Sequence, residues 1–180
     1  DGSKDNPYQV STPEHLNNVR EHLDAYFIQT ADIDMTAASG SGWEPIGTDK
    51  NTPFTGSYDG GGHRIIGLKS YLDGAGDQYA GLLGYNKGVI RNLGMVDGMV
   101  SANETAPYVS GNAYSGSIAG YNQGTVENCY NTCAVSAYVS AVSSSLSTAY
   151  AGGIVGYNSG ALINCRNTGE ISSSESSADA

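Results

Sequence analysis

Histidine is the residue best suited to metal and acid–base chemistry, and the chain has three copies: His15, His22 and His63. A zinc peptidase needs the pattern His-Glu-x-x-His, which places two ligands and a general base on one helix. None of the three histidines stands in that pattern. His15 and His22 would share a helix face, but ordinary solvated polar residues account for their spacing. The histidines therefore predict no metal site.

Cysteine offers two further kinds of chemistry, at Cys129, Cys133 and Cys165. A thiolate zinc site needs four ligands in short paired spacings, and no fourth ligand is evident. A disulfide between Cys129 and Cys165 would join equivalent positions of neighbouring repeats. Free buried thiols are favoured over a bridge, because Leu93 holds the same repeat position and needs no chemistry there.

Acidic residues would serve a carbohydrate-active enzyme if they converged on one surface, since such sites use clustered carboxylates or a basic group with Ca²⁺. The candidates are Asp32, Asp34, Asp49 and Asp59. Asp32 and Asp34 share a strand face, for which we favour simple solvation. A weak Ca²⁺ site in the Asp-rich loops is the remaining option. We predict no catalytic residue, no bound metal and no cofactor.

The amino-acid composition limits the classes of partner that this chain could bind. The 180 residues include 8 Lys and Arg against 18 Asp and Glu, a formal net charge of −10. Such a chain repels nucleic acid and anionic membranes and suits an extracellular protein. No apolar run reaches the length of a transmembrane segment. The chain begins at Asp1 without Met, so its terminus carries no information on localisation.

A period of 36 residues organises the sequence, because the segment around Gly84 recurs around Gly120 and again around Gly156. A fixed period of this size is typical of stacked repeats. Superposed copies give three apolar columns: Leu82 with Ile118 and Ile154, Ile90 with Val126 and Leu162, and Met99 with Val135 and Ile171. Equivalent side chains line up in this way when one rung of strand lies on the next, about 4.8 Å away.

Local composition favours strands over a helical solenoid. Glycine is frequent in every copy, and each glycine would cost a helix about 1 kcal/mol. The Tyr-Asn-x-Gly segments at Tyr85, Tyr121 and Tyr157 are predicted to be tight turns in which Asn and Gly accept positive φ angles. Because each copy runs in the same direction, the strands are predicted to be parallel. The predicted fold is an all-β parallel β-helix of roughly four coils.

One column is occupied by asparagine throughout, at Asn92, Asn128 and Asn164. An inward-facing Asn at a coil corner can hydrogen-bond its own turn and the amide above it, which forms a ladder. The following column holds Leu93, Cys129 and Cys165. Strict alternation places that column on the face opposite Asn, whereas a bend at Asn turns it inward. The sequence leaves both arrangements open.

The N-terminal part predicts a small α/β cap. Thr12 is a suitable N-cap and Pro13 a suitable first residue for a short helix that extends to about Leu23. End units of repeat arrays need a cover for their apolar faces and strand edges. We predict the cap over residues 1–50, the β-helix over 51–172 with repeats at about 80–114, 115–150 and 151–172, and a low-complexity linker over 173–180.

Two insertions, residues 103–114 and 137–150, occupy the same position in successive coils. They are predicted to stack on one side, where repeat proteins commonly place a binding surface. Exposed Tyr with Ser and Asn is typical of glycan- and protein-binding surfaces. The predicted ligand contacts are therefore the tyrosines in or beside the insertions: Tyr108, Tyr114, Tyr138 and Tyr150. The repeated Asn column and Gly84, Gly120 and Gly156 are predicted to be structural.

The three copies resemble the GLUG motif, named for Gly-Leu-(apolar)-Gly, which is present literally as Gly81-Leu82-Leu83-Gly84. The pattern continues through Gly-Tyr-Asn, a further Gly, an apolar strand and Asn-Cys or Asn-Leu. The upstream segments Trp43–Gly47 and Phe54–Gly60 are similar to the leader that often precedes such repeats. The resemblance implies a right-handed parallel β-helix from a large secreted or surface-attached bacterial protein, of a kind often described as adhesins. GLUG repeats also occur beside the catalytic part of some immunoglobulin-A-cleaving metallopeptidases, and the family supplies no catalytic residues.

These observations predict a non-catalytic adhesion or stalk module of a larger bacterial surface protein, located outside the cell. Its stacked insertions would face host, matrix or glycan ligands. One alternative is a carbohydrate-active β-helix enzyme, a polysaccharide lyase or hydrolase, and convergent carboxylates on an exposed sheet would favour it. The other is an accessory repeat domain of a secreted metallopeptidase. We expect no nucleic-acid partner, no membrane insertion and covalent continuity with a longer polypeptide.

Overall fold

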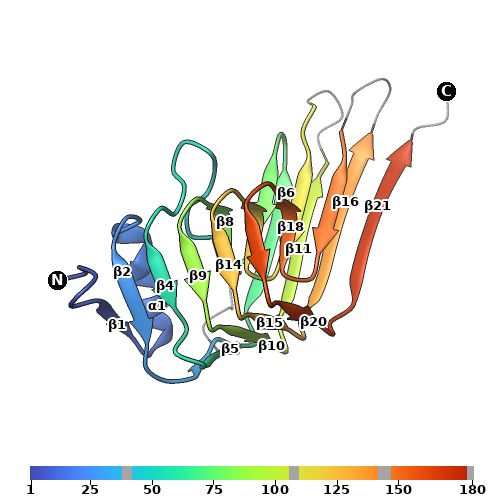
Figure 1. The fold of residues 1–180 in the computed structure, drawn as a ribbon. Helices are drawn as coiled ribbons and strands as arrows, with labels where there is room; N and C mark the ends of the chain where they lie inside the picture. The colour runs from blue at the N-terminus through green and yellow to red at the C-terminus, as the bar shows by residue number, and fades with distance from the viewer. Residues whose placement is uncertain (38–41, 106–109, 142–146, 178–180) are drawn as a thin grey trace.

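The computed structural model of the protein describes residues 1–37, 42–105, 110–141 and 147–177. The chain winds as a parallel β-helix, the fold class predicted from the repeat (Figure 1). Each turn adds one short strand to each of several parallel sheets. Neighbouring turns are held together by strand hydrogen bonds, as the spacing of the repeats requires. None of the helices in the described ranges has the length and apolar character needed to cross a bilayer.

Three sheets, here named A, B and C, form the body of the helix (Figure 1). Sheet A contains β1 (Tyr8–Val10), β2 (Tyr26–Gln29), β4 (Ser57–Asp59), β9 (Val89–Arg91), β14 (Thr125–Glu127) and β19 (Ala161–Ile163). Sheet B contains β3 (Ile33–Asp34), β5 (Arg64–Ile66), β10 (Gly94–Val96), β15 (Tyr130–Asn131) and β20 (Arg166–Asn167). Sheet C contains β8 (Leu83–Asn86), β13 (Ala119–Asn122) and β18 (Val155–Asn158).

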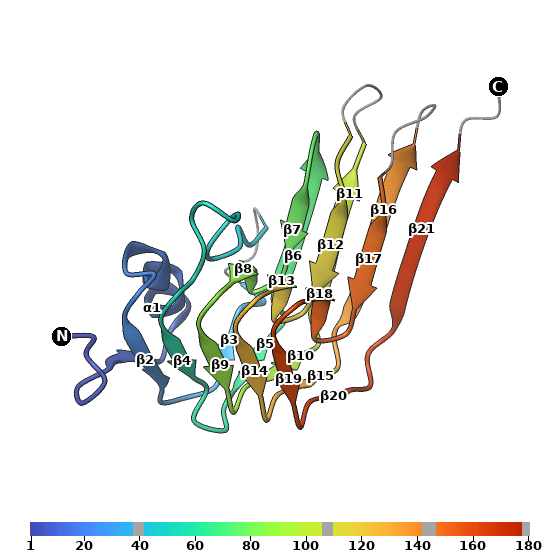
Figure 2. The same cartoon turned by 45° about the horizontal axis from the view of Figure 1, so that its top comes forward.

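Two further sheets, D and E, project from this body as a flat double layer that we call the fin (Figure 2). Sheet D contains β6 (Lys69–Gly74), β11 (Met99–Glu104), β16 (Ala134–Ala141) and β21 (Ile171–Ser177). Sheet E contains β7 (Gln78–Ala80), β12 (Ala113–Gly116) and β17 (Ala149–Gly152). A separate core of small apolar side chains, including Val100, Ala102 and Ala113, lies between the two layers. The two ends of each predicted insertion therefore belong to strands of the fin.

The apolar columns have the predicted register in the body and are shifted by one residue in the fin. Ile90 pairs with Val126 and Val126 with Leu162. Met99, however, pairs with Ala134, and it is Val100 that pairs with Val135. The prediction of Met99 in the Val135 column was wrong, because the corner before β11 is one residue longer than the corner before β16.

The column Asn92, Asn128 and Asn164 does line up, but at an outer corner and not inside the coil. All three residues have left-handed φ angles of 54°, 53° and 49°. Their amides bond from rung to rung, at 3.4 Å from Asn128 to Asn92 and 2.8 Å from Asn164 to Asn128. Asn128 and Asn164 are exposed, so the inward orientation was wrong. The left-handed residue bends the chain, and this bend turns Leu93 and Cys129 into the core.

A second asparagine column, which we call the inner asparagine ladder, has two buried members, Asn86 and Asn122, and an exposed last member at the end of the stack. It consists of Asn86, Asn122 and Asn158 in the Tyr-Asn-x-Gly segments. The Asn86 and Asn122 amides each donate over 2.7 Å to the next Asn in the column. None of the three has a positive φ, contrary to the prediction for these turns. Glycine is required there for close approach, since a Cβ on Gly124 would lie 2.0 Å from the carbonyl oxygen of Gly88.

The N-terminal helix covers the first turn of the stack. Helix α1 (Pro13–Asn18) is capped by Thr12, whose hydroxyl accepts a hydrogen bond from the His15 amide, as predicted. It continues as the 3₁₀ turn η1 (Val19–Glu21). Strands β1 to β3 belong to sheets A and B, although their residues fall in the predicted cap. Strand β21 likewise runs through residues for which a linker was predicted. The domain boundaries themselves remain a prediction.

Candidate functional site

The outer face of sheet D is a regular polar surface, and we call it the sheet D face. Alternation turns every second residue away from the fin core. The residues of this face are Lys69, Tyr71, Asp73, Met99, Ser101, Asn103, Ala134, Ser136, Tyr138, Ser140, Ser172, Ser174 and Ser176. Only Lys69 and Asp73 among them carry a charge. The face is therefore a nearly neutral grid of hydroxyl, amide and phenol groups.

Hydrogen bonds between rungs hold this grid in place. The Asn103 amide donates to the Tyr71 hydroxyl over 3.1 Å, and Tyr71 donates to Asp73 over 3.1 Å. The Ser136 hydroxyl donates to Ser101 over 3.0 Å. Tyr71 and Met99 remain 59% and 60% exposed. The face thus combines ordered polar groups with accessible apolar surface.

Two files of stacked tyrosines fill the angle between sheets C and E. One file contains Tyr79, Tyr114 and Tyr150, with ring centroids 4.9 and 5.1 Å apart. The other contains Tyr85, Tyr121 and Tyr157, with centroids 4.6 and 4.9 Å apart. The files meet edge to face, for example at Tyr79 and Tyr85. The middle rings, Tyr114 and Tyr121, are covered on both faces and present only edges, whereas a sugar ring stacks on an aromatic face.

Burial sets the electrostatics of the tyrosine files. Tyr114 is only 8% exposed, and its burial, together with the charge of Asp77, raises its pKa to about 12. Burial also raises the pKa of Tyr79 well above its usual value, and the Tyr79 hydroxyl donates to Asp77 over 3.0 Å. Both phenols remain protonated at neutral pH, which excludes them as general bases.

The four tyrosines predicted as ligand contacts fall in different surroundings. Tyr114 and Tyr150 are neighbours in one stacked file, on the sheet E side of the fin. Tyr138 lies on the sheet D face, with its hydroxyl 2.8 Å from that of Ser176. Tyr108 lies outside the described residues. The sequence signal missed Tyr71, because it belongs to a strand that precedes the first recognised copy of the repeat.

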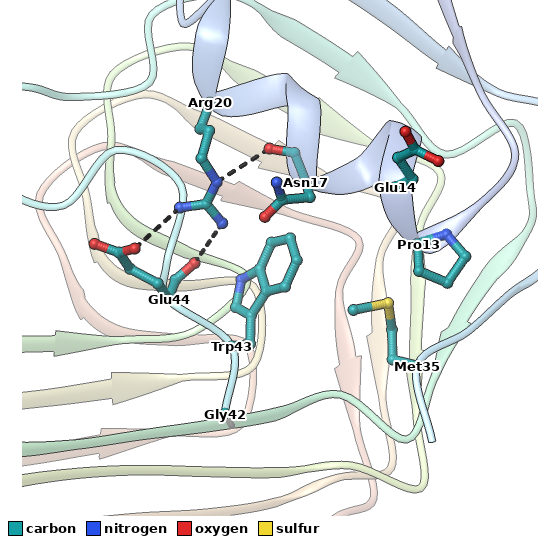
Figure 3. A pocket seen from close by; sticks show the side chains of 8 residues that line it. All are labelled: Pro13, Glu14, Asn17, Arg20, Met35, Gly42, Trp43 and Glu44. Carbon is teal, nitrogen blue, oxygen red and sulfur yellow. Dashed lines mark hydrogen bonds and ion pairs between the residues drawn. The ribbon is translucent and has the colours of Figure 1, made fainter. Parts of the chain in front are cut away.

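A pocket of about 570 Å³ opens between α1 and the segment around Trp43 (Figure 3). The Arg20 guanidinium lines the pocket and donates hydrogen bonds to the carbonyl oxygens of Asn17 and Glu44. It lies 5.2 Å from the centroid of the Trp43 ring. The Trp43 indole donates to the carbonyl oxygen of Leu82. These contacts fasten α1 to the first turn of the stack. With its cation and its indole already bonded to the protein, the pocket serves packing.

The acidic residues weighed for an enzyme or a Ca²⁺ site are dispersed. Asp32 pairs with Arg64, whose hydrogen bonds hold the Asp32 pKa below its usual value. Asp34 and Asp49 each cap their own turn. Asp59 accepts bonds from Arg91, Asn92 and Gly61. Within the described ranges, no three His, Cys, Asp or Glu side chains come together in a way that could hold a metal.

His15 and His22 make separate local contacts, and the cysteines lie in the core or pack against it. His15 contacts Ser11, and His22 stacks on Tyr8. All three cysteines are free, so the alternative of a Cys129–Cys165 bridge is not realised. Burial raises the pKa of the Cys129 thiol to about 12.

The glycines predicted to be structural lie where strands approach most closely. A Cβ on Gly84 would be 2.7 Å from the carbonyl oxygen of Gly47, and one on Gly120 would be 3.0 Å from that of Tyr114. A Cβ on Gly156 would be 2.7 Å from the carbonyl oxygen of Gly120. Each position precedes a stacked tyrosine, so the absent side chain leaves the room that lets the sheets meet.

Comparison with known proteins agrees with the repeat. The model of the GLUG motif family matches residues 147–172. Over 118 residues the chain is 39% identical to the "Putative Gly-rich membrane protein" of Evansella cellulosilytica, a match that covers 62% of this chain and 13% of that protein. It is 33% identical to Halomucin of Haloquadratum walsbyi over 114 residues, or 57% of this chain and 1% of the relative. The chain thus spans a small part of the curated relatives it matches.

A solved structure shares the fold. It is described as a putative immunoglobulin A1 protease from Bacteroides ovatus, and the comparison covers 97% of this chain and 60% of that one, with a TM-score of 0.65 and 24% identity. At this identity the likeness concerns the fold alone. The chain is a β-helical protein that carries a match to the GLUG motif at residues 147–172, and the matching family and sequence relatives name no catalytic enzyme family.

Proposed function

We propose that this chain is a non-catalytic adhesion module of a larger extracellular or cell-surface protein, and that it contacts its ligand through the sheet D face. The observation that carries the proposal is the flat, ordered grid of hydroxyl, amide and phenol groups on the projecting fin. A surface of this kind satisfies the hydrogen bonds of a hydroxyl-rich ligand with little reorganisation. A neutral glycan is the ligand class that it suits best.

Two features of the rest of the molecule support a binding role. The carboxylates that a glycosidase or lyase would need are dispersed and already bonded to their own turns or to arginine. The sequence relatives include a protein named as a membrane protein and a Halomucin, which is in keeping with a position at the cell surface.

A glycan and matrix-protein array tests the proposal. The 180-residue chain is expected to bind one class of neutral glycan, and Ser136→Glu, which places a charge at the centre of the grid, is expected to weaken binding by about tenfold or more. Thr125→Glu on the outer face of sheet A is the matched control and leaves binding unchanged. Absence of binding to every glycan and matrix protein on the array, or equal binding by both variants, would contradict adhesion through this face.

A further inference from the structure

A groove on the outer face of sheet A gathers positive charge on an otherwise acidic molecule. Two adjoining hollows of about 260 and 350 Å³ lie across β2, β4 and β9. They share four lining residues: Lys4, Tyr26, Ser57 and Arg91. Lys87 lines the second hollow as well, so three of the eight Lys and Arg residues meet here in a chain of net charge −10.

Arg91 is the best-ordered cation of the groove. Its Nε donates to Asp59 over 2.9 Å, which fixes the guanidinium while leaving the side chain 45% exposed. Within the described part of the chain, its two terminal nitrogens have no protein partner. A guanidinium held in this way presents two donors to a carboxylate or similar anion.

Asp59 does not cancel the positive charge of the groove. Its side chain is 19% exposed, and both of its oxygens are engaged by Arg91, Asn92 and the Gly61 amide. The carboxylate therefore orients Arg91, and its oxygens are already occupied by protein donors. Asp24 is the remaining acid of the lining, which also contains Lys4 and Lys87, and Glu127 neighbours Arg91 on the next strand of sheet A.

Tyr26 adds an apolar surface beside these charges. It is 39% exposed, and no ring contact covers it among the described residues, unlike the tyrosines of the two stacked files. An uncovered phenol ring can pack against a sugar ring. Ser57 and Thr55 supply hydroxyl groups along the same groove.

From these observations we infer that the sheet A groove binds a segment of an acidic polysaccharide, with uronate carboxylates paired to Arg91, Lys87 and Lys4 and a sugar ring against Tyr26. The groove crosses three strands, or about 10 Å at the usual strand spacing, so its ligand is larger than a single inorganic anion. This site is separate from the sheet D face and does not depend on the proposed function of the fin.

Calorimetric titration with oligogalacturonate tests the inference. The chain is expected to bind it with an affinity that falls as salt is raised. Arg91→Gln and Lys87→Gln should each weaken binding by about tenfold, the effect of losing one charge-assisted contact. Arg166→Gln, an equal change of charge at an exposed position on sheet B, is the control and should leave affinity unchanged.

Further arms of the experiment separate the ligand classes. Tyr26→Ala should weaken binding of the oligogalacturonate, and thermal melting of every variant confirms that it is folded. Absence of oligogalacturonate binding, or equal losses in Arg91→Gln and Arg166→Gln, would overturn the inference. Equal affinity for poly-glutamate or inorganic phosphate would also overturn it, because the groove would then select charge without the sugar. Ser136→Glu leaves this binding unchanged, so failure here and failure at the fin are distinguishable.

Discussion

Replacing Asn122 by alanine removes the middle member of the inner asparagine ladder. Asn122 is fully buried. Its oxygen accepts from the Asn86 amide over 2.7 Å and from the Gly124 amide over 3.2 Å. Its own amide donates over 2.7 Å to Asn158. The same amide also reaches the carbonyl oxygens of Gly124 and Ala161 over 3.2 and 3.3 Å. The substitution therefore breaks two short side-chain hydrogen bonds and three longer backbone contacts at once.

The expected cost follows from these contacts. Two net hydrogen bonds contribute about 1 kcal/mol each, and a buried amide left with poorer partners adds roughly another 1 kcal/mol. After the change, the Asn86 amide keeps only the longer bond of 3.3 Å to the Gly88 carbonyl, while the Asn86 oxygen still accepts from the Gly88 amide over 3.0 Å. Asn122→Ala should thus lower the free energy of unfolding by about 3 kcal/mol, or roughly 6–12 °C in melting temperature for a chain of this size.

Asn158→Ala provides the matched control, since it is the same substitution one rung further along the ladder. Asn158 is exposed at the last turn, and the buried Asn122 amide that loses it keeps the carbonyl oxygens of Gly124 and Ala161 at 3.2 and 3.3 Å. The cost should therefore stay below about 1 kcal/mol. Both variants of the 180-residue chain are measured by calorimetric and urea unfolding. Equal destabilisation of the two variants would refute the reasoning, because burial would then not determine the contribution of the ladder.

Three other outcomes are expected. Gly124→Ala should destabilise the fold by more than about 2 kcal/mol in urea unfolding, because its Cβ would lie 2.0 Å from a carbonyl oxygen of the neighbouring rung; Gly74→Ala, whose nearest contact would be 3.4 Å, should change stability by less than about 1 kcal/mol, and similar losses would argue against the close approach. The partly exposed Cys165 should react with a thiol reagent in the folded protein, whereas Cys129, buried and with its pKa raised to about 12 by that burial, should react only on unfolding. Burial tends to raise the pKa of Asp59, but its hydrogen bonds hold the pKa below the usual value, so its stabilisation is complete above about pH 4 and is lost as the pH falls through the folded-state pKa; the gap in stability between wild type and Asp59→Asn should close on acidification, and a constant gap would contradict this.

The repeat period could be read from the sequence because stacking is itself periodic. Ile90, Val126 and Leu162 pair rung on rung at a spacing of 36 residues. Parallel strands place equivalent residues over one another, so the same apolar requirement returns in each copy. The helix cap at Thr12 was equally predictable, since a cap depends on a few adjacent residues.

The direction in which a side chain points depends on corners that the period does not describe. Asn92 adopts a left-handed conformation, and this one angle carries its side chain outward and turns the next residue into the core. A corner one residue longer before β11 places Met99 on the surface and Val100 inside. The alternation of side chains determines which residues point inward only within one strand, and each corner can change which residue of the next strand points inward.

The candidate surfaces show the same division. From the sequence alone, the composition of the insertions indicated a polar, tyrosine-containing side of the molecule, and Tyr138 does lie on the sheet D face. Only the folded chain decided that Tyr114 is covered within a stacked file while Tyr71 is open. Likewise, the groove joins Lys4 of the N-terminal segment to Lys87 and Arg91 of a later turn. Repeats in the sequence encode how turns stack, whereas a surface made from several turns exists only once they have stacked.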